Sequence, residues 1–209
     1  MKWEELIAAV GPDPIFESGT LRVGPADPAD VSRQLSRWVA SGRLIRLRRG
    51  LYAFGGADSG IRRSSHPFEI ANRLVPGSYV SLGTVLAQSG LIPEYVPATT
   101  SVTTGRPGRR VTPLGAFVYR HVSAAMFWGF ETHALEGGGS AYVATPEKAL
   151  IDLLYLNAHS ADPDYLDGLR LQHLGRLRLD VLATMAETTE VSRVVSAVRY
   201  VTGLAQAGQ

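Results

Sequence analysis

Apolar and polar positions recur along the first ten residues at the spacing of an α-helix. Residues 3–10 place four apolar side chains on one side of that helix: Trp3, Leu6, Ile7 and Val10. Gly11 and Pro12 follow, and the pair ends the helix because neither residue suits a helix interior. A shorter element is expected at residues 15–22.

A longer apolar stripe predicts a second helix at residues 28–41. Asp27 is suited to cap this helix and Pro28 to occupy its first position. The stripe consists of Val31, Leu35, Trp38 and Val39. The opposite face carries Ser32, Arg33, Ser36, Arg37 and Ala40. Trp38 lies on the apolar stripe, so we interpret it as a core residue rather than a stacking surface.

Residues 43–54 are predicted to form a β-hairpin. Two short β-prone runs flank Gly50, which supplies the turn. The period-two alternation of a strand puts Ile45 and Leu47 on one side and Arg46 and Arg48 on the other. A helix, a short element, a basic-faced helix and a basic hairpin follow one another in residues 1–56. That order indicates a winged helix-turn-helix domain.

The remainder of the chain is predicted to be a second, larger domain of mixed α/β type. Residues 57–65 are polar and rich in Gly and Ser, which is typical of a linker. Residues 66–209 then form the larger domain, and the fold class as a whole is α/β. Helices are expected at 66–74, 83–89 and 145–157, strands at 78–82, 99–104, 116–122, 126–134 and 140–144, and a helical tail at 163–204.

Composition fits a folded protein in the cytoplasm. Hydrophobic residues make up 45% of the 209 residues, which is enough to form a core and excludes wholesale disorder. No apolar run approaches the length of about 18 residues that would indicate a membrane span. The chain holds no cysteine, which excludes disulfides and thiolate metal sites. We therefore expect a cytoplasmic protein that does not bind a membrane.

Charge is distributed unevenly along the sequence. Residues 31–63 hold 8 arginines against Asp58 alone, whereas residues 131–209 hold 6 basic and 10 acidic groups. This asymmetry points to a polyanion as the partner of the N-terminal domain. The predicted helix would present its polar face to base edges in the major groove of duplex DNA, and the hairpin would follow the phosphate backbone. The residues predicted to contact DNA are Ser32, Arg33, Ser36, Arg37, Arg43, Arg46, Arg48 and Arg49.

Two alternatives to this interpretation stay open. Every surface helix has a polar face, so the arginines could simply be solvated, and winged helices also serve as protein-interaction modules. A second basic cluster, Arg106, Arg109 and Arg110, is expected in a loop between two strands. It would extend the DNA contact, bind an acidic partner surface, or only promote solubility.

No motif in the sequence favours an enzyme. The 5 histidines lack the spacing of a metal site, and no phosphate-binding loop is present. Glu147 and Lys148 suggest a nuclease, but the Glu-x-Lys motif of such enzymes lies on a strand, whereas these two are adjacent at a helix start. The helix dipole favours an acid there without any chemistry. We expect no catalytic activity, no cofactor and no metal.

Four segments together resemble the AbiEi family of antitoxins from type IV toxin–antitoxin systems. They are residues 43–54 (RLIRLRRGLYAF), 78–94 (SYVSLGTVLAQSGLIPE), 99–104 (TTSVTT) and 143–156 (VATPEKALIDLLYL). The resemblance implies a winged helix that binds inverted repeats in its own promoter and represses it. It also implies a larger C-terminal domain that neutralises a cognate nucleotidyltransferase toxin, and an antitoxin that is not an enzyme.

The resemblance also assigns residues. The DNA-reading elements of the family fall on the helix with Arg33 and Arg37 and on the hairpin with Arg46, Arg48 and Arg49. The hallmark positions of its C-terminal domain fall on Tyr79, Ser81, Thr145, Pro146, Glu147 and Lys148. One departure is that residues 18–28 are rich in Gly and Pro, so the first half of the helix-turn-helix is expected to be irregular. A direct toxin-binding module and a generic winged-helix regulator are the alternatives to an autorepressing antitoxin.

Overall fold

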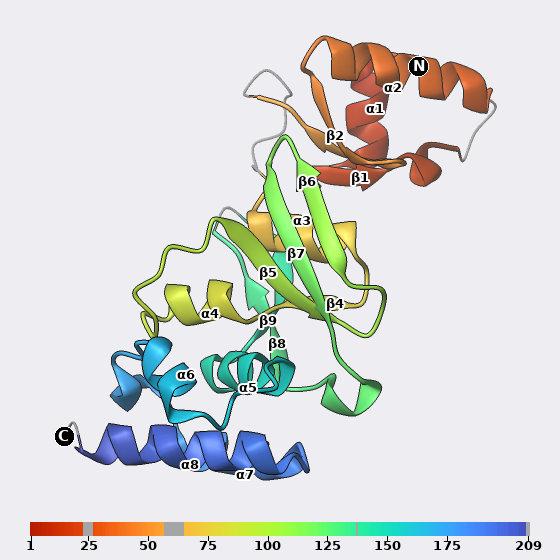
Figure 1. Ribbon diagram of the computed structural model, residues 1–209. Coiled ribbons are helices and arrows are strands. Elements are labelled where there is room, and N and C mark those ends of the chain that lie inside the picture. Colours follow the sequence, from red (N-terminus) through yellow and green to blue (C-terminus); the bar gives the residue numbers. More distant parts are fainter. Residues whose placement is uncertain (23–26, 57–64, 137, 208–209) are drawn as a thin grey trace.

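Two β-sheets organise the chain in a computed structural model that describes residues 1–22, 27–56, 65–136 and 138–207 (Figure 1). A three-stranded sheet lies in the N-terminal part, and a six-stranded sheet with helices on its faces forms most of the remainder. The predicted α/β fold class is therefore confirmed. The predicted linker at 57–65 falls, except for its last residue, outside the described ranges.

The N-terminal part has the element order of a winged helix. Its elements are α1 (Trp3–Val10), β1 (Ile15–Glu17), the 3-10 helix η1 (Ser18–Arg22), α2 (Pro28–Ala40), β2 (Leu44–Arg48) and β3 (Leu51–Phe54). The three strands are antiparallel in the order β1-β3-β2. As expected from the Gly- and Pro-rich sequence, a short 3-10 helix precedes α2 where a regular helix-turn-helix has its first helix.

The predicted start and core face of α2 are confirmed. The Asp27 carboxylate accepts a hydrogen bond from the Ala29 backbone N–H at 2.9 Å, and Pro28 is the first helical residue. Val31, Leu35 and Trp38 are buried against α1 and one face of the three-stranded sheet. The Trp3 and Trp38 rings meet edge to face at 5.0 Å.

A β-bulge in the hairpin makes the predicted alternation of its side chains wrong beyond Arg46. Arg46 pairs with Tyr52 and Arg48 with Leu51, so the register shifts between Arg46 and Arg48. The extra residue, Leu47, reverses the inside–outside alternation from that point on. Arg46 and Arg48 therefore do not share one side of the hairpin, and the expectation that they would is wrong.

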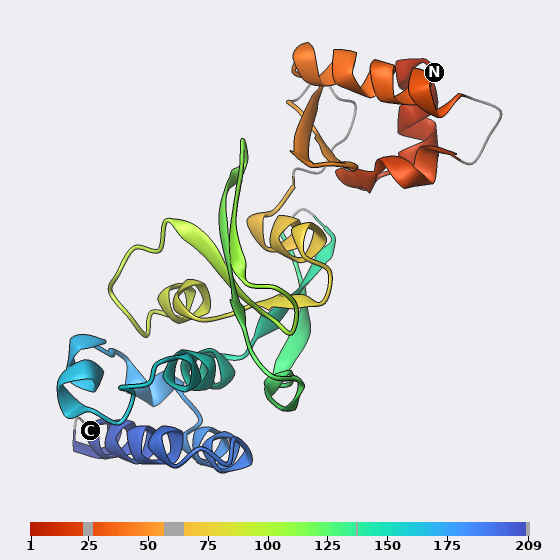
Figure 2. The ribbon, with the colours of Figure 1, turned by 45° about the vertical axis from the view of Figure 1, so that its right-hand side comes forward.

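The C-terminal part contains a mixed sheet in the order β6-β7-β5-β4-β9-β8. Its strands are β4 (Ser78–Val80), β5 (Ala98–Thr103), β6 (Gly108–Thr112), β7 (Gly115–His121), β8 (Phe130–Ala134) and β9 (Ser140–Ala144). Its helices are α3 (Pro67–Leu74), α4 (Gly83–Gln88), η3 (Ala124–Met126), α5 (Pro146–Leu156), α6 (Pro163–Gly168), η4 (Leu174–Arg176), α7 (Leu179–Thr188) and α8 (Ser192–Ala207). α3 lies on one face of the sheet and α4 and α5 lie on the other (Figure 2).

Three predictions for this part need correction. Arg109 and Arg110 lie in the edge strand β6, not in a loop, because β6 pairs with β7 in a tight antiparallel hairpin. The strand expected at 126–134 begins only at Phe130, because a 3-10 helix occupies Ala124–Met126. The C-terminal tail is not one continuous helical region, since α6, α7 and α8 are separated by turns that include Arg170, His173 and Glu190 at positive φ.

The two sheets are joined through buried apolar side chains. Ile15, Leu47, Leu51 and Ala53 point away from α1 and α2 and belong to the same apolar cluster as Ile70 of α3 and the core of the six-stranded sheet. The three-stranded sheet is thus buried on both faces. Burial of both faces fixes the sheet between α2 and the C-terminal part, which places α2 at the outer end of the molecule (Figure 1).

Candidate functional site: a nucleic-acid interface

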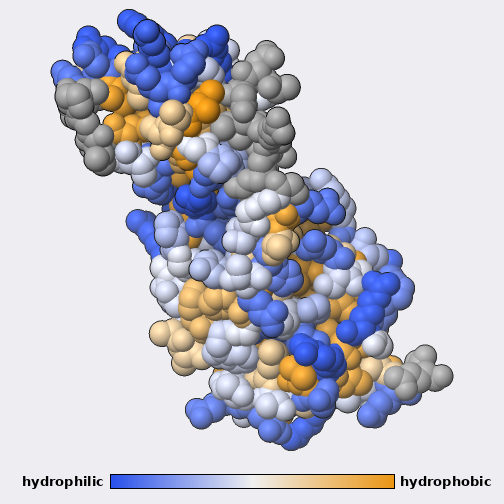
Figure 3. Space-filling view, turned by 180° about the vertical axis from the view of Figure 1, so that it is seen from behind, coloured by the Kyte–Doolittle hydropathy of each residue, from blue (hydrophilic) through white to orange (hydrophobic). Residues whose placement is uncertain are grey.

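The outward face of α2 presents the four side chains that the helical spacing predicted. Ser32, Arg33, Ser36 and Arg37 are all exposed, while Leu35 between them is buried. The Ser36 hydroxyl donates to the Ser32 carbonyl at 2.9 Å. Seen from behind, the end of the molecule that carries α2 is covered mainly by hydrophilic side chains (Figure 3). This helix face is free to enter the major groove of a duplex.

Arg33 forms an ion pair with Asp30, one helical turn earlier on the same surface. The two side chains are 70% and 63% exposed, so solvent screens the pair. Such an exposed pair contributes little to stability, about 0.2–1 kcal/mol, and a phosphate or a guanine edge could replace the carboxylate. Arg37 takes part in no ion pair within the described part of the chain.

The hairpin brings three further arginines to the surface. The Arg43 guanidinium lies over the Trp3 ring, 5.4 Å from its centroid, which holds it beside the start of β2. Arg46 is exposed on β2 and Arg49 is exposed in the turn between β2 and β3. Among the described residues neither Arg46 nor Arg49 has an acidic partner. Unpaired guanidinium groups of this kind are suited to phosphate contacts.

Arg48 is placed differently from the other predicted contacts. Because of the bulge, its side chain is half-buried beside the C-terminal part, where it donates to the Glu17 carboxylate at 2.9 Å and to the Arg73 carbonyl at 3.5 Å. It also donates to the Arg49 carbonyl at 3.2 Å. The bond to Arg73 joins β2 to α3, and the bond to Glu17 joins β2 to β1. The DNA contact predicted for Arg48 stays a prediction, but its guanidinium already has three partners in the free protein.

The second basic cluster is not gathered at one point. Arg106 lies in the turn before β6, and Arg109 and Arg110 are consecutive in β6. Register pairs Arg109 with Val118 and Arg110 with Phe117, so the two side chains leave opposite faces of the sheet. All three are exposed, and Arg110 donates to the Arg109 carbonyl at 3.2 Å. The cluster is thus divided between both faces of an edge strand.

Three of the six hallmark residues of the C-terminal part, Tyr79, Ser81 and Lys148, are buried together around Asp152. The Tyr79 and Ser81 hydroxyls donate to one carboxylate oxygen of Asp152, at 3.0 and 2.7 Å. The Lys148 ammonium binds the other oxygen and also donates to the Met126 carbonyl at 3.0 Å. Lys148 and Asp152 are fully buried. These residues connect β4, α5 and the segment before β8, which is a structural role.

Burial and charge act against each other in this cluster. Burial raises the pKa of the Asp152 carboxyl and lowers the pKa of the Lys148 ammonium, while their mutual attraction opposes both shifts. Burial also raises the pKa of the Tyr79 phenol. The Lys148 ammonium lies 4.6 Å from the centroid of the Trp128 ring. Gly129 lets the Lys148 side chain pass, because a Cβ on Gly129 would lie 2.9 Å from its Cγ.

Glu147 belongs to a separate ion pair. Its carboxylate accepts hydrogen bonds from the backbone N–H of Arg178 at 3.0 Å and from the Arg178 guanidinium at 3.3 Å. Burial raises the pKa of Glu147, but the hydrogen bonds from Arg178 outweigh burial and leave that pKa lowered. Thr145 caps α5 by accepting from the Lys148 N–H at 3.2 Å, and Pro146 is its first residue. Glu147 and Lys148 therefore bind different partners and do not form one acidic–basic site.

Asp152 is the residue that the sequence analysis missed. The signal was present, because an aspartate stands four residues after Lys148 in an otherwise apolar run, and this spacing places both side chains on one helix face. Its hydroxyl donors come from β4 and the residue directly after it, far away in the sequence, and could be matched to it only through the fold.

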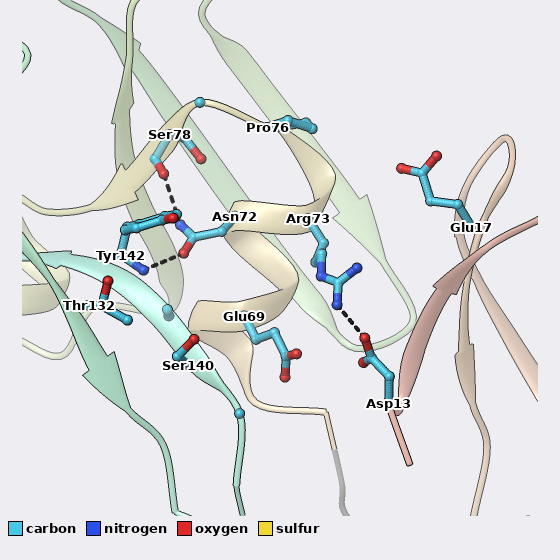
Figure 4. A pocket seen from close by; sticks show the side chains of 13 residues that line it. Asp13, Glu17, Glu69, Asn72, Arg73, Pro76, Ser78, Thr132, Ser140 and Tyr142 are labelled. Carbon is cyan, nitrogen blue, oxygen red and sulfur yellow. Dashed lines mark hydrogen bonds and ion pairs between the residues drawn. The ribbon is translucent and has the colours of Figure 1, made fainter. Parts of the chain in front are cut away.

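A cleft of about 570 Å³ opens between the N-terminal part and the edge of the six-stranded sheet (Figure 4). Arg73 crosses it to bind the Asp13 carboxylate. Asn72 donates to the Ser78 carbonyl at 3.1 Å and accepts from the Tyr142 N–H at 2.7 Å. The polar side chains of this cleft thus connect α3 to the segment before β1, to β4 and to β9. No group of metal-ligating side chains occurs among the described residues.

Comparisons with known proteins agree with this picture. Residues 15–55, from β1 to just past the end of β3, match the family model described as "Transcriptional regulator, AbiEi antitoxin". A crystal structure of the RV2827C protein from Mycobacterium tuberculosis is similar in fold, with a TM-score of 0.51 and 15% identity over 95% of this chain and 75% of that chain. No curated protein matches the sequence.

Within the described ranges, none of the helices combines the length and apolarity that crossing a membrane requires. The family match covers β1, α2 and the β2–β3 hairpin, which are the elements that carry the exposed arginines. Residues 15–55 of this chain are therefore similar to the AbiEi antitoxin family of transcriptional regulators.

Proposed function

We propose that the chain is the antitoxin of a type IV toxin–antitoxin system and represses its own promoter by binding DNA there. The α2 face would contact base edges in the major groove, and the hairpin arginines would neutralise phosphates. Repression would follow from occupancy, because polymerase is excluded while the chain covers inverted repeats. The protein would act in the cytoplasm, without cofactor or catalytic activity of its own.

One observation carries the DNA-binding proposal. Within a domain that matches a transcriptional-regulator family, Arg37, Arg46 and Arg49 are exposed and have no acidic partner among the described residues. A solvated surface helix usually balances its arginines with nearby acids, as Arg33 and Asp30 do here. Arginines left unbalanced on one end of the molecule create the positive field that a polyanion needs.

The test is a titration of the full chain into a labelled duplex of its own promoter, followed by fluorescence anisotropy at several salt concentrations. We expect tight binding that weakens steeply with salt, with a log–log slope of about −0.9 for each phosphate neutralised. A scrambled duplex of equal length is the control. Equal affinity for both duplexes, or no binding at low salt, would contradict the proposal.

The toxin-directed half of the proposal has its own test. The family name supports an antitoxin role, and a cognate nucleotidyltransferase encoded beside the chain would be the partner. Co-expression of that neighbour with and without the chain would show whether growth is rescued. A stable complex would favour the alternative of direct sequestration, whereas rescue without a complex would favour antagonism without contact. No rescue would leave a generic winged-helix regulator.

A further inference from the structure

Strand β8 forms one outer edge of the six-stranded sheet. It pairs with β9 on one side, and within the described ranges no strand pairs with its other side. Residues 131–134 are all exposed. An edge strand of this kind can accept a further strand, because its outward N–H and C=O groups have no partner in the sheet.

The hydrogen bonds at the two ends of β8 show which of its backbone groups are already used. Just before β8, the Gly129 carbonyl accepts from the Thr145 N–H at 3.2 Å. Just after β8, the Leu135 N–H donates to the Gly139 carbonyl at 3.1 Å. Bonded pairs recur at every second residue of an antiparallel ladder, so the odd-numbered residues of 129–135 bond to β9.

The even-numbered residues of β8 direct their backbone groups outward. Tyr142 of β9 lies opposite Thr132 and agrees with this, since its N–H donates to the Asn72 side chain at 2.7 Å and not to β8. The outward groups are the N–H and C=O of Phe130, Thr132 and Ala134. Among the described residues, these groups have no hydrogen-bond partner.

Charge complementarity favours one register for a second copy of the chain on this edge. Antiparallel pairing of β8 with β8 of a second copy uses the outward groups when even-numbered residues lie opposite one another. A register centred on Glu131 sets two carboxylates opposite each other, and one centred on His133 sets two imidazoles opposite each other. The register centred on Thr132 instead sets Glu131 of each copy opposite His133 of the other, and opposite charges across strands attract.

The register centred on Thr132 also uses the whole strand. It pairs Phe130 with Ala134 at both ends and Thr132 with its own copy in the middle. Each of these pairs exchanges two backbone hydrogen bonds, about six in all. Cross-strand pairs of threonine with threonine stabilise a sheet as well.

The opposite edge of the sheet, β6, does not fit a second copy. Full-length antiparallel pairing of β6 with itself is centred on Arg110 and sets two guanidinium groups opposite each other. Arg109 adds a further positive charge beside them. Like charges on an edge strand are a device that prevents edge-to-edge pairing. The sheet therefore has one edge that excludes a second copy and one that matches it.

We propose that two copies of the chain join through β8, as antiparallel strands centred on Thr132, into one continuous sheet with two-fold symmetry. The contact is isologous, because the same residues of both copies meet. One chain supplies α2 to one arm of an inverted repeat, and the pair supplies a reading helix to both arms. This last step rests on the promoter binding proposed above, whereas the pairing rests on the strand alone.

Sedimentation equilibrium of the full chain over a range of protein concentrations tests the pairing, and we expect a monomer–dimer equilibrium. His133→Glu sets carboxylates opposite each other and is expected to raise the dissociation constant of the dimer at least tenfold. The exchange Glu131→His/His133→Glu restores carboxylate–imidazole pairs and should return the constant to within threefold of wild type. The matched control is His159→Glu, an exposed site just after α5, which should stay within twofold.

A second variant removes a hydrogen bond instead of a charge. The Thr132 N–H points away from β9, so Thr132→Pro spares the β8–β9 ladder and removes a donor at the centre of the pairing. It is also expected to raise the dissociation constant at least tenfold, and circular dichroism checks the fold of every variant. In wild type, the outward amides of β8 should exchange hydrogen more slowly at high protein concentration than at low concentration.

The outcomes separate this proposal from promoter binding. A wild-type chain that stays monomeric at every concentration overturns the pairing, and so does a dimer that both His133→Glu and Thr132→Pro leave unchanged. An exchange variant that dimerises no better than His133→Glu also overturns it, because charge would then not set the register. A monomer that binds its promoter would leave autorepression standing, whereas a β8 dimer that ignores its promoter would refute autorepression and leave the pairing standing.

Discussion

The ammonium of Lys148 and the carboxylate of Asp152 form an ion pair in which neither side chain is exposed at all. The pair lies one turn apart on α5, and Asp152 receives two further hydroxyl donors, Tyr79 of β4 and Ser81 directly after it. A buried pair of this kind is costly to break, because removal of one partner leaves an uncompensated charge in the interior.

Removal of Asp152 should therefore destabilise the chain more than removal of the whole pair. Asp152→Ala is expected to lower the free energy of unfolding by about 3–5 kcal/mol, since it leaves the buried Lys148 ammonium without its carboxylate partner. The double variant Lys148→Met/Asp152→Ala should recover part of this loss. Urea unfolding followed by circular dichroism measures both, and a double variant less stable than the single one would show that the charge is not the cause.

The Glu147–Arg178 contact predicts a specific acid sensitivity. The hydrogen bonds from Arg178 hold the pKa of Glu147 below its ordinary value of 4.5, so the stability they contribute is complete above pH 4.5. It is lost as the pH falls below that value through the lowered pKa of the folded state. Wild type should exceed Glu147→Gln in stability at pH 7, and the gap should narrow below pH 4.5. Thermal melts of both proteins across this pH range test whether the difference in stability narrows. A difference that stays constant would contradict the prediction.

Arg46 and Arg48, separated by the bulge, should differ in their effect on DNA binding. Arg46→Ala removes a solvent-facing cation and should reduce the salt slope of promoter binding by about 0.9. Arg48→Ala should change the slope less, because its guanidinium binds Glu17 and the Arg73 carbonyl in the free protein. Anisotropy titrations at four salt concentrations compare them, with Arg199→Ala as control. Equal slope changes would mean that Arg48 exchanges its partners for a phosphate.

The α2 face should govern sequence preference rather than overall affinity. Arg37→Ala is expected to lose about 1–3 kcal/mol of discrimination between the promoter and single-base variants of it, while binding to unrelated duplexes changes little. Arg49→Ala in the hairpin turn should weaken all duplexes alike. Competition titrations with a set of variant duplexes measure the difference, and identical behaviour of the two variants would exclude α2 as the reading element.

Substitution by alanine at two glycines should change the free energy of unfolding in opposite directions. Gly129 has φ +72° and no room for a Cβ beside Lys148, so Gly129→Ala should lower the free energy of unfolding by about 1–3 kcal/mol. Gly203 lies within α8 with nothing within 4 Å of an added Cβ, so Gly203→Ala should raise stability by about 0.5–1 kcal/mol. The denaturant midpoint of each variant measures this change in stability. If Gly129→Ala left the midpoint unchanged, the Lys148 side chain would be able to shift and make room for the added Cβ.

Local signals in the sequence accounted for the helices of the winged domain and for α5. Asp27 and Thr145 act as the caps that their positions predicted, and Trp38 lies in the core as its spacing required. These features depend on neighbours within a few residues. They can therefore be predicted from the sequence alone.

Features that depend on distant partners were not predictable in this way. The bulge that turns Arg48 away from Arg46 is fixed by the pairing of β2 with β3 and by Glu17 and Arg73. The sequence predicts a loop at β6, because Pro107 and Gly108 favour a turn and the residues that follow them form a strand only through pairing with β7. The role of Asp152 depends on the Tyr79 and Ser81 hydroxyls, which are more than 70 residues away in the sequence.

Burial of both faces of the three-stranded sheet has a practical consequence for dissecting this protein. A fragment that stops near residue 56 would leave Ile15, Leu51 and Ala53, which are fully buried in the whole chain, facing water. Such a fragment would tend to self-associate through that bare apolar surface and would give misleading DNA affinities. Point substitutions in the intact protein are the sounder way to separate promoter control from toxin neutralisation.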